Sequence, residues 1–127
     1  DRIAVGRNVS GMQYAEALRF REHWRQRVAS LFHDGIDMLA MPTTPFTAPL
    51  ADPTADMGET SNRINRNNFP WSLAGVPALS LPSGFDASGL PTGLQLVGPR
   101  WHDAKLLVAG KAFQDATDWH LRAPRLG

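Results

Sequence analysis

The stretch that most limits the possible folds is "GVPALSLPSGFDASGLPTGLQLVGP", which covers residues 75–99 and is apolar, rich in Gly and Pro, and nearly free of charge. Two segments in it, Ala78–Leu81 and Gly93–Val97, alternate with a period of two residues, as half-buried β-strands do. We therefore predict strands at residues 78–82 and 93–97. About ten residues separate them, which is short for a parallel crossover, so we expect an antiparallel pair.

A long amphipathic helix is predicted before this stretch. Ser10 and Gln13 have the spacing of a capping box, in which each side chain bonds to the backbone N–H of the other residue. Apolar side chains then recur at intervals near 3.6 residues, namely Tyr14, Ala17, Leu18, Trp24, Val28, Leu31 and Phe32. The pattern indicates a helix over residues 12–33 that stops near Gly35.

The other segments complete an α/β pattern. We predict a buried strand at residues 37–41, a long loop at 42–68, a helical turn at 70–75, and a final helix at 103–118 that Asp103 caps. Both long helices are expected to pack on the sheet. Three strands leave at least one edge unpaired, and this favours a chain that is part of a larger fold.

Composition excludes several function classes. The chain has 127 residues, the size of one domain, and a net charge of +1, too small to attract nucleic acid or an anionic membrane. No apolar run approaches the length of a membrane span. There is no cysteine, which excludes disulfides and thiolate zinc sites and favours a cytoplasmic location.

Groups that could carry catalysis are scarce. The histidines have no metal-binding spacing, and they are His23, His33, His102 and His120. The only lysines, Lys105 and Lys111, are six residues apart on the predicted last helix, where they point to different faces and are typical of solvated charges. We therefore predict no catalytic residue, no metal site and no cofactor in this chain.

Four arginines gather on the first predicted helix, and they are Arg19, Arg21, Arg25 and Arg27. They allow two interpretations, a contact with RNA or a solvated helix face that Glu16 and Glu22 help to neutralise. The near-zero net charge favours the solvated face. A non-catalytic binding module that contacts RNA through this basic helix stays as an alternative of another class.

Four segments, in this order, resemble the C-terminal third of the amidase signature family. They are "LFHDGIDMLAMPTTPFTAP" (31–49), "FPWSLAGVPALSLPSGF" (69–85), "GLPTGLQLVGP" (89–99) and "ATDWH" (116–120). The resemblance implies that residues 1–127 form one C-terminal segment of a large mixed β-sheet flanked by helices. Strands covered on both faces in such a sheet are apolar throughout, which explains the uncharged stretch.

The resemblance also implies an activity and a division of labour. Family members are serine hydrolases that cleave amides with a lysine, a cis-peptide serine and a nucleophilic serine, all N-terminal to the portion seen here. No residue of this chain matches those positions, so we transfer none of them. We expect the chain alone to be inactive, and to pack against the N-terminal part of the same fold or to self-associate.

A substrate pocket is implied near residues 65–72. The family pattern Thr-x-Pro-x-Asn reads "NFPWS" here, and the positions carried over as substrate-binding are Asn68, Trp71 and Ser72. The implied ligand is a small carboxylic amide, bound by the complete enzyme.

One departure from the family bears on the substrate. Glutamine-using relatives are expected to hold the substrate ammonium with an acidic side chain, whereas this chain has Asn65 there and no carboxylate between Glu59 and Asp86. We therefore favour apolar or aromatic amides. The A subunit of a glutamine-dependent tRNA amidotransferase is the alternative within the family.

Overall fold

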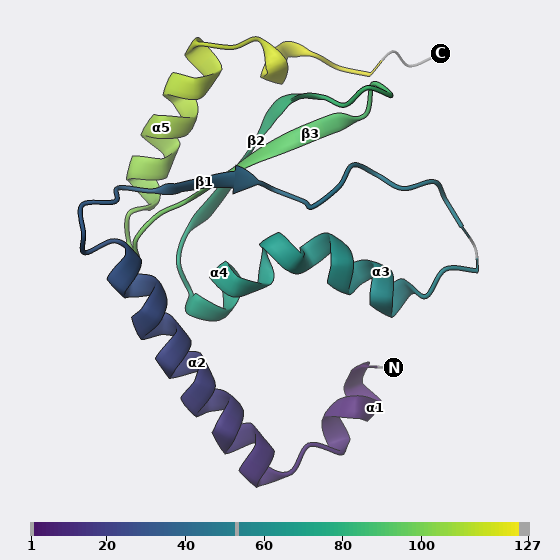
Figure 1. Ribbon diagram of the computed structural model, residues 1–127, viewed down its shortest axis with the longest axis vertical. Coiled ribbons are helices and arrows are strands. Elements are labelled where there is room, and N and C mark those ends of the chain that lie inside the picture. The colour runs from purple at the N-terminus through teal and green to yellow at the C-terminus, as the bar shows by residue number, and fades with distance from the viewer. Residues whose placement is uncertain (1, 53, 125–127) are drawn as a thin grey trace.

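The computed structural model describes residues 2–52 and 54–124, which form a three-stranded sheet with helices on both sides (Figure 1). The strands are β1 (Leu39–Pro42), β2 (Ala78–Phe85) and β3 (Pro91–Val97). The helices are α1 (Arg2–Arg7), α2 (Gly11–Leu31), α3 (Met57–Ile64), α4 (Phe69–Ala74) and α5 (Asp103–Asp115), with single 3-10 turns η1 (Asn65–Asn67) and η2 (Trp119–Leu121). The predicted α/β class is confirmed.

Strand β3 lies in the middle of the sheet, in the order β1-β3-β2, and both of its pairings are antiparallel. Val97 is the partner of Leu39 on one side and of Ala78 on the other. The predicted hairpin is therefore confirmed. Strand β2 continues past its predicted end to Phe85, because an irregularity between Pro82 and Gly84 shifts the register and lets pairing resume.

The two faces of β3 pack against different helices. Leu94 and Leu96 face α5, in a core built on Leu81, Leu96 and Leu106. Helix α5 approaches this face closely at Gly110, where an added Cβ would lie 2.6 Å from Leu79 Cδ2. Gln95, which alternates with Leu94 and Leu96, points to the opposite face, under η1 and α4. Figure 1 shows α4 and α5 on opposite sides of the sheet.

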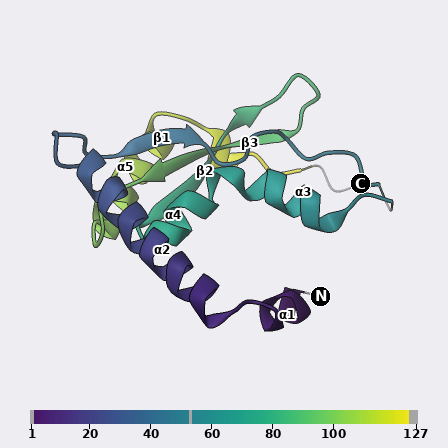
Figure 2. The ribbon, with the colours of Figure 1, turned by 60° about the horizontal axis from the view of Figure 1, so that its bottom comes forward.

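Helix α2 begins as predicted. Ser10 Oγ accepts a bond from Gln13 N at 3.2 Å, and Gln13 Oε1 accepts one from Ser10 N at 2.8 Å. The prediction that this helix packs on the sheet was wrong in its main contact, because α2 packs chiefly on α4 (Figure 2). Trp24 Nε1 donates to Pro70 O at 2.7 Å across this contact. Among the described helices, none is long and apolar enough to cross a membrane.

The predicted loop over residues 42–68 was wrong in its second half, where α3 and η1 form. Asp56 is the N-cap of α3, and its Oδ1 accepts bonds from Gly58 N and Glu59 N. The Asp56-x-x-Glu59 spacing carried that signal, but the Gly, Thr, Ser and Asn around it are poor helix formers. The predicted cap of α5 was also wrong, since His102 is the N-cap and Asp103 lies in the first turn.

Truncating the core should test this packing. Leu96 is 6% exposed in the α5-facing core, so Leu96→Ala should lower the free energy of unfolding by about 2–5 kcal/mol through lost burial and a residual cavity. The control is Leu107, which lies on the same helix as Leu106 but is 62% exposed. Leu107→Ala should change the free energy of unfolding by about 0.5 kcal/mol or less. Urea unfolding followed by circular dichroism measures both. Equal losses would contradict the assignment of this face as core.

Candidate functional site

The candidate site lies where η1 and α4 cover one face of the sheet. Local sequence sets α4: Pro70 suits the first helical turn, where no intrahelical N–H bond is needed, and Gly75 ends the helix with a φ of 68°. The helical turn predicted at 70–75 is confirmed. This short helix and the residue before it hold the three positions carried over as substrate-binding, Asn68, Trp71 and Ser72.

Asn68 is tied to the sheet through a buried carboxamide. Gln95 on β3 is 2% exposed, and its Nε2 donates to Asn67 O at 3.2 Å and to Asn68 Oδ1 at 3.1 Å. Gln95 Oε1 is fully buried and has no partner among the described residues. The interior of this face is therefore polar at the middle of the central strand, which is unusual because unsatisfied buried polar atoms cost free energy.

Polar groups continue across the neighbouring strands on the same face. The hydroxyls of Thr43 and Ser80 lie 2.7 Å apart, and Asn67 Nδ2 donates to Pro42 O at 2.9 Å. The hydroxyl contact passes over Gly93, where a Cβ would lie only 2.7 Å from Thr43 Oγ1. Glycine is thus required for the approach of Thr43 and Ser80.

Trp71 and Ser72 have different surroundings. Trp71 is half-buried, and its Nε1 is fully buried without an acceptor among the described residues. Ser72 lines an open apolar groove of about 660 Å³ between α2 and α4. The other residues that line this groove are Phe20, Trp24, Phe69, Pro70 and Leu73. The structure therefore brings Asn68 to Gln95 but places Ser72 on the groove.

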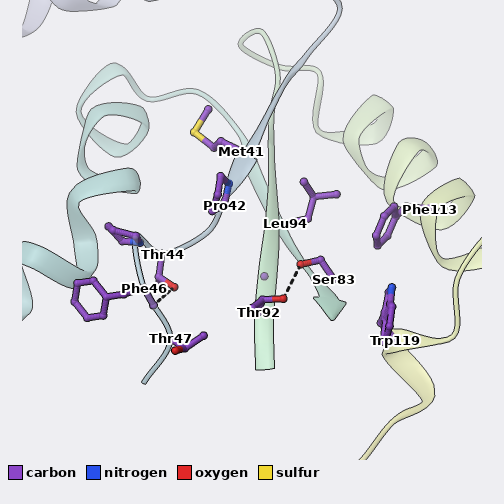
Figure 3. Close-up of a pocket in the computed structure, with 12 residues that line it drawn as sticks. Met41, Pro42, Thr44, Phe46, Thr47, Ser83, Thr92, Leu94, Phe113 and Trp119 are labelled. Atoms are coloured by element: carbon purple, nitrogen blue, oxygen red, sulfur yellow. Dashed lines mark hydrogen bonds between the residues drawn. The ribbon is translucent and has the colours of Figure 1, made fainter. Parts of the chain in front are cut away.

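A second cavity, which the sequence analysis missed, lies on the α5 side of the sheet and has a volume of about 610 Å³ (Figure 3). Figure 3 shows Phe113 and Trp119 on one side of it and Thr44, Phe46 and Thr47 on the other. Ser83 and Thr92 lie between them, with their hydroxyls 3.3 Å apart. Its apolar and hydroxyl lining suits contact with an uncharged group, and its described lining residues include no acid–base pair.

Asp86 holds Thr47, one of the residues that line this second cavity. Its carboxylate accepts a bond from Thr47 Oγ1 at 2.6 Å and from the backbone N–H groups of Ser88 and Leu90. The Thr47 hydroxyl, followed by the Leu90 N–H, lowers the pKa of Asp86 from its usual 3.8. The carboxylate thus joins the β2–β3 turn to the segment after β1. Within the described ranges, no group of histidines and carboxylates could hold a metal ion.

Comparison with known sequences gives a consistent family. A family model described as Amidase matches residues 2–107. The A subunit of glutamyl-tRNA(Gln) amidotransferase from Synechococcus elongatus is 40% identical over 114 residues, which are 89% of this chain and 23% of the relative. The corresponding protein of Aromatoleum aromaticum is 39% identical, over 98% of this chain and 26% of the relative. The chain therefore spans about a quarter of the length of these relatives.

Solved structures share the fold. A 6-aminohexanoate cyclic dimer hydrolase superposes with a TM-score of 0.76 and 26% identity, over 92% of this chain and 27% of that one. The A subunit of glutamyl-tRNA(Gln) amidotransferase from Thermotoga maritima gives a TM-score of 0.67 and 28% identity, over 92% and 26% of the two chains. A third match is a chain from a vestigial protein complex that is linked to the evolutionary origins of an s-triazine catabolic enzyme. It superposes with a TM-score of 0.81 and 31% identity, over 97% of this chain and 28% of that one. The sheet flanked by helices is the arrangement that these proteins contain.

Removing the Thr47 hydroxyl should raise the pKa of Asp86. In Thr47→Val the largest cause of the lowered value is lost, so the carboxyl titration followed by NMR should move up towards 3.8. Because the pKa is lowered in the folded chain, the stabilisation is present above pH 3.8 and is lost as the pH falls through the lower folded value. Thr54→Val, which removes a bond to Asp52 only, should leave the Asp86 titration unchanged. An unmoved titration in Thr47→Val would contradict this assignment.

Proposed function

The chain belongs to the amidase signature family, and from that premise we propose that it forms the C-terminal structural and pocket-forming portion of a C–N hydrolase acting on carboxylic amides. The observation that carries the proposal is the continuous family match over residues 2–107, which includes the buried Gln95–Asn68 contact. The relatives are about four times as long as the matched part, so the activity belongs to a complete enzyme.

The two lysines support a catalytic centre outside these residues. A lysine that acts as a base on serine must lie within hydrogen-bond reach of the hydroxyl. Lys105 Nζ instead lies 2.6 Å from Asp37 Oδ1, and Lys111 pairs with Asp115 one turn along α5. Both lysines are therefore surface ion pairs, and we propose that the nucleophile and its base come from the N-terminal part of the fold.

The apolar groove between α2 and α4 supports the same proposal. Phe20 is 62% exposed, Phe69 49% and Leu73 38%, and together they leave a contiguous apolar surface. We propose that the N-terminal part of the enzyme covers this surface and leaves Phe69 and Ser72 to line the amide pocket between the two parts. The sequence analysis expected such a partner, or self-association, without placing it. A cytoplasmic location, which the lack of cysteine favours, belongs to the same proposal.

The segment over η1 and α4 is our candidate for the wall of the amide pocket, with Asn68, Trp71 and Ser72 as its proposed contacts. This wall carries no carboxylate, and Arg66 would repel an ammonium group. Phe69 and Trp71 offer flat apolar surface. We therefore propose an apolar or aromatic amide as the substrate.

A second candidate is the A subunit of a glutamine-dependent tRNA amidotransferase. It is favoured by relatives of that name that are 36–42% identical to this chain. Such a protein would assemble with further subunits, and it would use glutamine as its amide. The two candidates differ in the group that the wall formed by η1 and α4 must bind.

The purified chain of residues 1–127 should show no turnover of a chromogenic amide, whereas the full-length enzyme should show turnover that a serine-directed inhibitor abolishes. Loss of a nucleophile and its base removes many orders of magnitude of rate. Steady, inhibitor-sensitive hydrolysis by the isolated chain would overturn the proposed division of labour.

The full-length enzyme should hydrolyse simple aryl and aliphatic amides in preference to glutamine. Trp71→Ala should lower kcat/KM for aryl amides by about tenfold, the scale of losing an aromatic contact. Trp101→Ala is the matched control, because Trp101 is 83% exposed on the loop before α5. A clear preference for glutamine would favour the second candidate, and an unchanged profile in Trp71→Ala would remove Trp71 from the pocket.

A further inference from the structure

The buried carboxamide of Gln95 can adopt only one orientation. Its neighbours are Asn67 O and Asn68 Oδ1, at 3.2 and 3.1 Å. Asn67 O is a backbone carbonyl, which can only accept, so Gln95 must direct Nε2 and not Oε1 towards it. Reversing the carboxamide would bring two acceptor oxygens together at a site where Gln95 is 2% exposed.

The orientation of Gln95 determines that of Asn68. Nε2 has two hydrogens, and the second is directed to the Asn68 side chain, which must present its own oxygen, Oδ1, in return. Asn68 Nδ2 then points away from Gln95. The backbone carbonyl of Asn67 therefore fixes the orientation of the Gln95 carboxamide, and Gln95 in turn fixes the orientation of the Asn68 carboxamide.

Asn68 Nδ2 is consequently a free donor. Asn68 is half-buried, and its Nδ2 is not among the fully buried atoms that lack a partner, so it reaches the surface. In the described ranges, its side chain makes only the bond through Oδ1. Arg66, two positions before Asn68 in the sequence, is exposed and adds a positive charge to this segment.

We propose that Gln95 is a positioning residue that holds Asn68 as a hydrogen-bond donor to the substrate. Among apolar and aromatic amides, the enzyme then favours those whose acyl group also carries a carbonyl or carboxylate oxygen at this point, and it rejects those with an ammonium. The inference rests on the proposed function and adds the polarity of the group recognised. An ammonium offers only donors, which cannot bond to Nδ2. Sites that hydrogen-bond one substrate group discriminate strongly against a substrate that leaves the bond unmade.

Two substrates of nearly equal shape test the proposal. One is the para-nitroanilide of levulinic acid, which has a ketone in its acyl chain, and the other is its analogue with an ammonium on the same carbon. The full-length enzyme should favour the ketone by about tenfold or more in kcat/KM. A preference for the ammonium, or no preference, would overturn the proposal.

Asn68→Asp replaces Nδ2, the donor atom that does not contact Gln95, with an oxygen. The bond to Gln95 stays in place, because Oδ1 still accepts from Gln95 Nε2. The new oxygen replaces Nδ2, so the preference should invert towards the ammonium substrate. Asn62→Asp makes the same change of charge at an exposed position on α3 and should keep the ketone preference. An unchanged ratio in Asn68→Asp, or an equal change in Asn62→Asp, would overturn the proposal.

Gln95→Met removes the donor and keeps the length of the side chain, so the preference between the two substrates should fall towards unity. A purely structural role would lower both rates together and leave their ratio unchanged, which would overturn the positioning role. If Gln95→Met does not fold, the Asn68→Asp and Asn62→Asp pair still decides the donor role of Asn68.

A measurement without turnover separates this inference from the proposed function. If the full-length protein hydrolyses no amide, the proposed function fails, but the Asn68 side-chain amide signals in NMR spectra still report its orientation. These signals should be sharp in the native protein and should shift in Gln95→Met, because the bond to Oδ1 is lost. Identical signals in the two proteins would overturn the dependence of Asn68 on Gln95.

Discussion

The rest of the structure depends on the burial of β3 on both faces. A central strand has to satisfy two packing surfaces with alternating residues, so Leu94 and Leu96 meet α5 while Gln95 turns to η1 and α4. This constraint explains why the surrounding stretch is apolar and rich in glycine. Close packing favours glycine at position 98, just after β3, because an added Cβ there would lie 3.1 Å from Leu106 Cδ2.

Gln95, the buried polar residue of this strand, connects the sheet to η1 and α4. Burying Gln95 costs free energy, and the two bonds from Nε2 to η1 and to the residue before α4 offset the part of that cost that belongs to the nitrogen. Those bonds hold the start of α4 against the sheet. Helix α2 packs against α4 in turn, with a hydrogen bond from Trp24 to Pro70. In the proposed function, a segment to which no catalytic residue is assigned would shape the substrate wall by fixing which donors and acceptors that wall presents.

Sequence reasoning succeeded where a local pattern and the tertiary environment agree. The alternation in β2 and β3, the capping box at Ser10 and the helical turn at 70–75 all depend on residues within a few positions of the feature they determine. It failed where composition hid a cap, as at Asp56 before α3. Asn68 and Trp71 came from resemblance, and neither Gln95 nor the cavity beside Phe113 had a local signal.

The sequence by itself determined the α/β class, the antiparallel hairpin and the family, because periodicity and ordered motifs are local properties of the chain. Only the tertiary structure decided what each face of β3 meets, that α2 packs chiefly on α4, and that Gln95 bonds to Asn68. The physical reason is that Gln95 and Asn68 are 27 positions apart. Whether a buried carboxamide finds an acceptor depends on which elements the fold brings together, and no spacing along the chain encodes that.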